Sequence, residues 1–294
     1  MGLRANPTYR QRRFGAEVRK LRERAGLSVG QSAAVMSMNQ SHISNVESGR
    51  TGLSAERVRA LVAATGRENS TYVDALVAMS QASGKGWWTA YRGKLRPSLM
   101  DLSELEASAD AILCYEPTFI PGLLQTREYA TAIHRAGYVR TSREEDELAI
   151  EFRLERQKVL TRERAPRFHA IIHEAALRPS LGDRALMRGQ LLRLIELSRL
   201  PNVTLQVVPF DGPVPFGSSF TMIEPAVAEL STVIVAHVEK SMYLGDADAL
   251  ARYNGALAKM CEVALPPVDA TVSPEARGVK DSLGLIQRLL YPLL

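Results

Sequence analysis

The stretch Leu27–Arg50 constrains the fold most, because its apolar residues fit two short helices separated by a tight break. Ser28 is a favourable N-cap for the first helix, and Asn39 is one for the second. The break between them falls at Ser37-Met38. The helical period indicates that five apolar side chains face inward, namely Ala33, Val35, Met36, Ile43 and Val46. This pattern predicts a helix-turn-helix.

The outward face of the second predicted helix carries small or amide side chains, where a solvated helix usually carries Lys and Glu. These residues are Gln40, Ser41, Ser44 and Asn45. An amide pairs in bidentate fashion with an adenine edge in the major groove, and a hydroxyl bonds to several bases. The second helix is therefore predicted to read the bases of a double-stranded DNA operator. The alternative is an ordinary helical hairpin inside a protein core.

Residues 14–66 resemble the phage-repressor-like, or XRE, helix-turn-helix domain. The matching positions are Leu21-Arg22, Gly26-Leu27-Ser28, Ile43-Ser44, Glu47, Gly49-Arg50 and the later helix that begins at Ser54. The resemblance implies a five-helix domain in which the four outward residues read bases. It places a second set at phosphates, namely Ser28, Asn39, Ser48 and Arg50. It also implies a structural ion pair between Arg22 and Glu47.

Two positions depart from this family. Val29 stands where the family usually has Gln, which removes one phosphate donor, and Ser37 stands where Gly is common. Ser tolerates many turn geometries, so the predicted turn is still expected.

Charge is distributed unevenly along the chain. Residues 1–100 contain 16 Lys and Arg against 6 Asp and Glu, whereas residues 101–294 contain 21 against 26. A basic first part followed by a slightly acidic remainder is typical of a DNA-binding domain joined to a domain that does not bind DNA. A solvated basic face gives the same count, so the charge balance alone does not indicate DNA binding. It supports the interpretation that the helix-turn-helix pattern indicates.

The sequence argues against several classes of protein. No apolar run approaches the roughly 20 residues of a membrane span, and the basic N-terminus lacks an apolar signal core, so we predict a cytoplasmic protein without membrane association. Cys114 and Cys261 are far apart, and His169 and His173 fall on a predicted strand without metal-ligand spacing. No nucleophile, phosphate-loop or dinucleotide motif occurs. We therefore predict no disulfide, metal, cofactor or enzymatic activity.

We predict a helix-turn-helix domain over 1–82, a linker with an aromatic anchor over 83–94, and an α+β sensory or partner-binding domain over 95–294. The first domain is mainly α with five helices, and residues 1–11 are expected to form a flexible arm. Trp87, Trp88 and Tyr91 follow the linker sequence Ser83–Gly86 and are either a packing anchor for the next domain or part of a ligand pocket.

The second predicted domain alternates helical and strand-like segments. Helices are expected over 102–112, 144–164, 187–200 and 245–264, and strands over 168–172, 203–209, 220–223 and 233–238. They predict an α+β domain with a short sheet. The tail Leu283–Leu294 is apolar and docks either on its own domain or on a second subunit. A homodimer is predicted because one recognition helix covers only a few base pairs.

This second part resembles actinobacterial XRE regulators, WhiJ-like among them, whose C-terminal domain has no known function. The matching positions are Trp87/Trp88, Glu106 with Ala109, and Ile120–Thr126 with Tyr129-Ala130. The resemblance implies an antitoxin-like regulator that binds a small partner protein. The rival interpretation is a ligand-responsive regulator with a small-molecule pocket. The residues predicted for the ligand or partner pocket are Trp87, Trp88, Tyr91, Tyr115, Pro121 and Gln125.

Overall fold

The structure is a computed structural model that describes residues 3–66, 70–136, 142–178, 183–212, 217–237, 241–271 and 280–294. The chain divides into two compact units. The first comprises Met1–Ser108 with Ala226–Glu229, and the second comprises Ala109–Pro225 with Leu230–Leu294.

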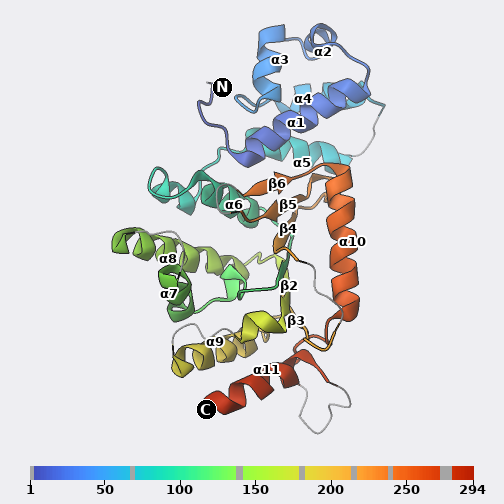
Figure 1. Cartoon of the computed structure of the whole chain (residues 1–294). Helices are drawn as coiled ribbons and strands as arrows, with labels where there is room; N and C mark the ends of the chain where they lie inside the picture. The colour runs from blue at the N-terminus through green and yellow to red at the C-terminus, as the bar shows by residue number, and fades with distance from the viewer. Residues whose placement is uncertain are drawn as a thin grey trace. The chain divides into compact units, whose positions relative to one another are not determined.

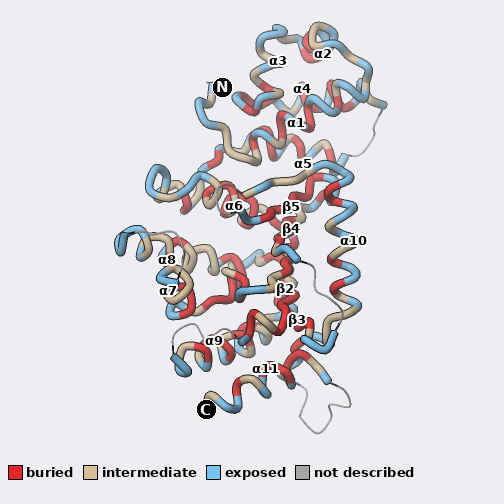
Figure 2. The backbone as a smooth tube through the Cα atoms, viewed as in Figure 1, coloured by how far each residue is buried: buried red, intermediate tan, exposed pale blue. Residues whose placement is uncertain are grey.

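The first unit opens with the five helices that the sequence predicts. They are α1 (Tyr9–Arg24), α2 (Val29–Val35), α3 (Gln40–Glu47), α4 (Ala55–Ala63) and α5 (Ser70–Gln81) (Figure 1). Their core contains Phe14 and Leu21 from α1, Ile43 and Val46 from α3, and Leu76 from α5 (Figure 2). The helical period of each segment therefore placed most inward side chains correctly.

Val35 was expected in this core, and that prediction is wrong, since it is 39% exposed. Ala33 and Met36 are both buried, and their spacing of three residues puts them on one face of the chain. Val35 lies one residue, or about 100°, away from Met36 and so faces outward.

The first unit continues beyond the predicted boundary through η1 (Trp87–Tyr91) and α6 (Pro97–Ala107). Asp101 of α6 fastens this extension to α1: its carboxylate accepts a hydrogen bond from the backbone N–H of Tyr9 at 2.8 Å and pairs with Arg12 at 3.2 Å. Pro97 favours the first helical position, which explains why α6 begins earlier than the predicted helix over 102–112.

The second unit is built on a six-stranded mixed sheet with strand order β3-β2-β1-β4-β5-β6. The strands are β1 (Ala111–Glu116), β2 (Arg167–His173), β3 (Val203–Val208), β4 (Phe220–Glu224), β5 (Thr232–Val235) and β6 (Met242–Leu244). β1, β2 and β3 are parallel, and β4, β5 and β6 continue the sheet with antiparallel pairings. The α+β fold class predicted from the sequence is thus confirmed.

Two of these strands are absent from the sequence prediction. Ile112 was assigned to a helix but lies in β1, which is paired on both sides and carries the almost continuously buried run Ala111–Glu116. Such a run has the same hydrophobic pattern as a buried helix. The short edge strand β6 has only three residues and no periodic signal. The end of the predicted strand over 233–238 lies outside the described residues.

Helices cover both faces of the sheet. α7 (Arg127–Ala136), α8 (Arg143–Gln157) and α9 (Arg184–Leu197) lie on one side, and α10 (Ala247–Val263) lies on the other (Figure 1). Leu250 and Leu257 of α10 pack in the same apolar cluster as Tyr115 and Phe220 of the sheet.

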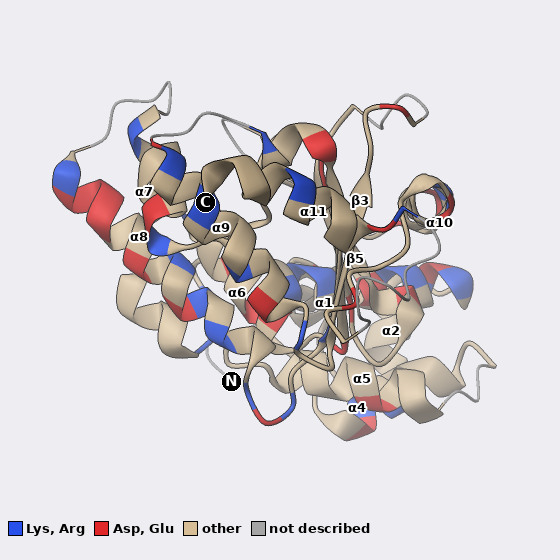
Figure 3. Ribbon diagram, turned by 90° about the horizontal axis from the view of Figure 1, so that it is seen from below, with Lys and Arg blue, Asp and Glu red and all other residues tan. Residues whose placement is uncertain are grey.

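The start of α8 is acidic, with Glu144, Glu145 and Asp146 in its first turn (Figure 3). The short helices are η2 (Gly122–Leu124), η3 (Lys158–Leu160), η4 (Glu174–Leu177), η5 (Ala228–Leu230) and η7 (Tyr291–Leu293).

The apolar tail forms α11 (Ser282–Leu290) and packs within its own unit. Leu283, Leu285 and Ile286 are buried, and the hydroxyl of Ser282 accepts a hydrogen bond from the backbone N–H of Val207 in β3 at 2.9 Å. Of the two arrangements expected for the tail, the structure shows the one in which it docks on its own domain.

Candidate nucleic-acid interface

The turn between α2 and α3 has the geometry that a helix-turn-helix requires. Ser37 has a φ of 50° and is the only non-glycine residue with positive φ in the described part of the chain. Arg57 of α4 holds this turn, because its guanidinium donates to the carbonyl of Met36 at 3.1 Å and to that of Ser37 at 3.3 Å. The turn therefore fixes α3 against α2 without glycine at the left-handed position.

The outward face of α3 presents the residues that were predicted to read bases. Gln40, Ser41 and Ser44 are exposed and Asn45 is half-buried, while Ile43 and Val46 on the opposite face are fully buried. The Asn45 amide donates to the carbonyl of Ser41 at 3.1 Å, and its side-chain oxygen is a further group that can accept a hydrogen bond. A row of amide and hydroxyl groups thus stands on a helix whose other face is anchored in the core.

The residues predicted to lie at phosphates are all exposed and lie at the ends of α2 and α3. Ser28 caps α2 in a reciprocal capping box with Gln31, and Asn39 is the N-cap residue of α3. Ser48 follows α3 and donates to the carbonyl of Asn45 at 3.1 Å. Arg50 stands in the next loop, whose backbone is held by Arg4: the Arg4 N–H donates to the Arg50 carbonyl at 2.8 Å. Helix N-termini and a nearby guanidinium are groups that bind phosphates.

The same contact corrects the prediction of a flexible arm over 1–11. Arg4 donates a second hydrogen bond, from its side chain to the Gly49 carbonyl at 3.2 Å, and α1 already begins at Tyr9. From Arg4 onward the arm is therefore part of the folded unit and supports the loop after α3, while residues 1 and 2 lie outside the described part of the chain.

A buried ion pair fastens α3 to α1. Nε of Arg22 lies 2.5 Å from Oε1 of Glu47, and the side chains of Arg22 and Glu47 are 13% and 6% exposed. Arg19 joins them, with its Nε 3.0 Å from Oε2 of Glu47. Burial raises the pKa of Glu47, but the hydrogen bonds and charges of both arginines outweigh burial and hold that pKa below its ordinary value. The carboxylate is therefore charged and shared between two guanidinium groups.

Sequence reasoning missed two of these supports. Arg19 lies one helical turn before Arg22 on the same face of α1, so its spacing was a usable signal. Arg57 had no local signal, because its acceptors are backbone carbonyls about twenty positions earlier in the sequence.

α1 and α3 approach each other closely at Gly15, because glycine has no Cβ atom. A Cβ atom at this position would lie 2.5 Å from the carbonyl oxygens of Val46 and Glu47. Only glycine allows this contact without displacing α3.

The six residues predicted for a ligand or partner pocket belong to different units. They line neither the cavity between α7 and α9 nor the one beside α11. Trp87, Trp88 and Tyr91 form η1 in the first unit. Tyr115 is fully buried in β1 against Phe220, where burial raises the pKa of its hydroxyl to about 12.

Pro121 and Gln125 belong to the loop around η2, which is held by three glutamine side chains. The Gln125 amide donates to the carbonyl of Ile120 at 2.7 Å. Gln157 and Gln190 donate to the carbonyls of Gly122 and Leu124 at 3.0 and 2.9 Å. These bonds satisfy backbone carbonyls of a largely buried loop and hold it against α8 and α9.

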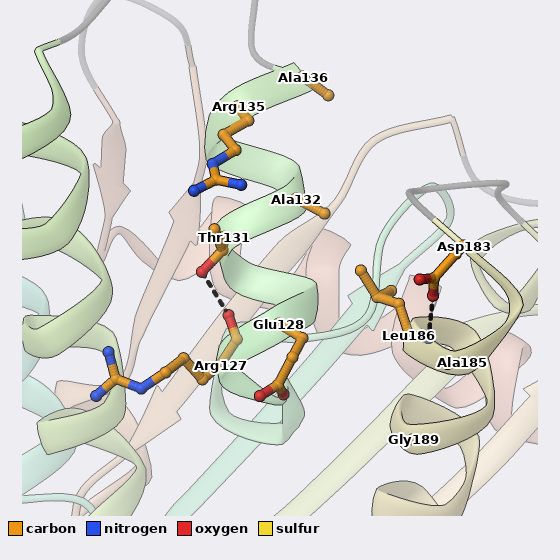
Figure 4. A pocket seen from close by; sticks show the side chains of 10 residues that line it. All are labelled: Arg127, Glu128, Thr131, Ala132, Arg135, Ala136, Asp183, Ala185, Leu186 and Gly189. Carbon is orange, nitrogen blue, oxygen red and sulfur yellow. Dashed lines mark hydrogen bonds between the residues drawn. The ribbon is translucent and has the colours of Figure 1, made fainter.

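The larger cavity lies between α7 and α9 and has a volume of about 800 Å³. Figure 4 shows Ala132, Ala136 and Leu186 facing the space between the helices, while Arg127 and Arg135 extend from the other side of α7. A smaller cavity of about 250 Å³ lies beside α11 and is lined by residues that include Pro209, Leu265 and Arg288.

Within the described ranges, no helix is both long and apolar enough to cross a membrane. The same residues contain no group of three or more His, Cys, Asp or Glu side chains arranged to hold a metal ion. His169 bonds through its ring to Gln206 at 2.7 Å, and His173 accepts a backbone hydrogen bond from Ala175 at 3.1 Å.

Comparison with known families agrees with the geometry. A family model described as a helix-turn-helix domain matches residues 13–71. A second model, described as a domain of unknown function (DUF5753), matches residues 99–272, which is more than half of the chain. No curated protein and no solved structure matches the chain. The predicted helix-turn-helix is thus confirmed at the level of the domain.

Proposed function

Because this chain belongs to the DUF5753 family and carries a helix-turn-helix domain ahead of that domain, we propose that it is a sequence-specific DNA-binding transcriptional regulator of the XRE type. The observation that carries the proposal is the outward face of α3, where exposed amide and hydroxyl groups stand on a helix anchored by buried Ile43 and Val46. Such a face reads base edges when the helix enters the major groove.

In this proposal the four outward residues, Gln40, Ser41, Ser44 and Asn45, read bases. Phosphates on either side bind at the N-termini of α2 and α3, through Ser28 and Asn39, and at the loop after α3, through Ser48 and Arg50. The phosphate contacts set the register of α3 on the duplex, and the amides give the sequence preference. The chain needs no cofactor or catalytic activity for this role, which it would perform in the cytoplasm.

The test is selection of bound sequences from random duplex DNA with the full chain, followed by affinity measurements on the selected operator. Asn45→Ala and Gln40→Ala should each cost about 1–3 kcal/mol on the operator and relax the preference at one base position. Asn254→Ala in α10 removes the same amide from an exposed helical position of the second unit and should change nothing. An Asn45→Ala protein that selects the parental sequence with parental affinity would rule out the assignment of α3.

We further propose that the regulator binds its operator as a homodimer. A single recognition helix gives too few base contacts for operator affinity, and two-fold pairing places two such helices about 34 Å apart on one face of DNA. The selected operator should then be an inverted repeat, and light scattering of the full chain at micromolar concentration should give twice the monomer mass. A monomer on an asymmetric site contradicts this part of the proposal.

For the second unit we propose an antitoxin-like role, in which it binds a small partner protein that changes DNA binding. The support is the resemblance carried by Ile120–Thr126 and the residues around it. Co-purification of one small protein, which alters operator affinity when added back, is the expected result.

The alternative is a ligand-responsive regulator, and the cavity between α7 and α9 favours it. Its volume of about 800 Å³ lies within the range of small-molecule sites. Thermal stabilisation of the chain by a metabolite extract freed of protein would support this alternative. The ligand-responsive alternative is excluded if the co-purifying small protein stabilises the chain and the metabolite extract does not.

A further inference from the structure

A basic and aromatic segment follows α5 in the first unit and plays no part in the helix-turn-helix itself. No acidic residue occurs between Asp74 and Asp101, a stretch that contains Lys85, Arg92, Lys94 and Arg96. Figure 1 shows this segment as the teal chain that leads from α5 into α6. Its positive charge is therefore not neutralised by neighbours in the sequence.

The part of this segment just before α6 is an ordered turn. In Arg92–Arg96, which we name the basic turn, a β-bridge joins Arg92 to Leu95, and the N–H of Lys94 donates to the Tyr91 carbonyl at 3.0 Å. Gly93 has a φ of 77°, which a residue with a side chain rarely adopts. The turn thus has a hydrogen-bonded backbone from which its cationic side chains extend.

The cations of the basic turn are open to solvent. Arg92, Lys94 and Arg96 are all exposed. Among the residues that the structure describes, none forms an ion pair with Arg92 or Lys94. By contrast, Arg19 and Arg22 of the same unit are occupied by Glu47. Arg92 and Lys94 therefore offer positive charge that the described part of the fold does not neutralise.

Aromatic packing anchors the turn on its N-terminal side. Trp88 is buried, and its ring lies so close to Gly86 that a Cβ atom there would approach it to 2.4 Å. Trp87 contacts both Trp88 and Tyr91 edge to face, at centroid distances of 5.9 and 6.1 Å. This packing explains why the turn stays ordered at the surface.

A chain of contacts connects the basic turn to the predicted phosphate contacts of the helix-turn-helix. The loop after α3 rests on α1, because a Cβ atom at Gly49 would lie 2.8 Å from Cα of Arg12. Arg12 in turn pairs with Asp101 of α6. Asp101 lies five residues after Arg96, so the basic turn ends only about 7.5 Å away from it along the helix axis.

A second tie links the same elements. Glu104 of α6 is buried and interacts electrostatically with Arg10 at the start of α1 and with Arg4 of the arm. Arg4 is the residue that holds the backbone of Gly49 and Arg50. α6 is therefore tied to the loop that carries Arg50 through the Arg12–Asp101 pair, and the charge of Glu104 attracts Arg4 in addition.

We propose that the basic turn Arg92–Arg96 is a second contact with the DNA phosphate backbone, beside the one made at Arg50. The inference rests on the proposed DNA-binding function and extends it. Guanidinium and ammonium groups on a rigid turn bind phosphodiester oxygens and carry no base preference. The contact strengthens operator and random DNA alike and makes binding more dependent on salt.

We favour DNA over an acidic protein as the binding partner of the turn. The turn belongs to the unit that contains the helix-turn-helix and is tied to the loop after α3, where Arg50 is proposed to bind phosphate. An acidic protein surface would also accept these cations. If the turn bound such a protein instead, DNA affinity would not depend on Arg92 and Lys94. DNA binding by a variant that lacks both cations therefore distinguishes the two partners.

The test is the salt dependence of DNA binding by the full chain carrying Arg92→Ala with Lys94→Ala. Each phosphate contact contributes about 0.9 to the slope of log affinity against log salt concentration, so two lost contacts reduce the slope by roughly 2. Raising the salt from 50 to 200 mM weakens DNA binding by some factor in each protein. That factor should be about ten times smaller for the double variant than for the parent. The ratio of operator to random-DNA affinity should stay at the parental value.

Matched controls separate charge from folding. Arg252→Ala with Lys259→Ala removes two exposed cations from α10 of the second unit and should leave the slope unchanged. Arg92→Lys should keep the parental slope, since the charge remains. Tryptophan fluorescence of each variant checks that the first unit is folded.

The outcomes also separate this inference from the proposed function. If Arg50→Ala and Asn45→Ala weaken binding but the double variant keeps the parental slope, the basic turn does not contact DNA and the regulator proposal stands. If the double variant affects only the binding of a protein, the turn serves that protein. If the parent itself binds no DNA, both proposals fail.

Discussion

Replacing Glu47 by Gln should destabilise the first unit, because it keeps the size of the side chain and removes the charge that Arg19 and Arg22 share. Removing one partner of a buried ion pair typically costs about 3–5 kcal/mol. Arg22 retains a hydrogen bond to the carbonyl of Leu27 at 3.2 Å, and Arg19 is 58% exposed and turns to water. We therefore expect a loss near the lower end of that range, about 3 kcal/mol.

The assay is urea unfolding of the full chain followed by tryptophan fluorescence. Both tryptophans, Trp87 and Trp88, lie in the first unit, so the signal reports on that unit. The control is Asp74→Asn, which breaks an ion pair with Arg59 whose side chains are 71% and 59% exposed. Exposed pairs contribute roughly 0–1 kcal/mol, so this control should shift the midpoint little.

A double-mutant cycle sharpens the interpretation. Glu47→Gln combined with Arg22→Met removes the uncompensated guanidinium, so it should recover part of the stability that Glu47→Gln loses. If Glu47→Gln unfolds at the parental urea concentration at neutral pH, the ion pair does not stabilise the unit and the reasoning fails.

The pH dependence gives an independent check. Burial raises the pKa of Glu47, but the two arginines lower it further than burial raises it. A carboxyl group whose pKa is lowered in the folded state stabilises the protein above its unfolded pKa, which is about 4.3 for Glu. That contribution disappears as the pH falls through the folded pKa, so the parent and Glu47→Gln should converge in stability in acid.

Three further outcomes follow from the described geometry. Ser37→Gly should raise the free energy of unfolding by about 1 kcal/mol and so shift the urea midpoint upward, because Gly adopts a φ of 50° without the cost that other residues bear; a lower midpoint would contradict this. Gly15→Ala should lower both stability, by about 1–3 kcal/mol, and DNA affinity, since the added methyl group pushes α3 away from α1; parental binding would show that the contact is unimportant. A chain ending at Lys280 should lower the melting temperature of the second unit by circular dichroism, because loss of α11 exposes the surfaces that Leu285 and Ile286 cover, whereas parental melting would mean that the tail is dispensable.

The sequence alone was sufficient for the helix-turn-helix. The apolar positions of each helix, the N-cap at Ser28 and the inward pair Ile43 and Val46 lie within a few residues of one another. Helical hydrogen bonds, caps and turns are local, so a short window contains most of the information that determines them. The outward position of the four predicted base-reading residues follows from the same local period.

The tertiary structure decided features that depend on residues far apart in sequence. β1 is a strand because β2 and β4 supply hydrogen bonds on both of its edges, although its apolar run equally suits a helix. Asp101 belongs with the first unit because it pairs with Arg12, 89 positions earlier. The tail is covered because β3 and α9 offer it a surface within the same unit. Partners of this kind are chosen by packing and by the need to satisfy buried polar groups, and no local pattern encodes them.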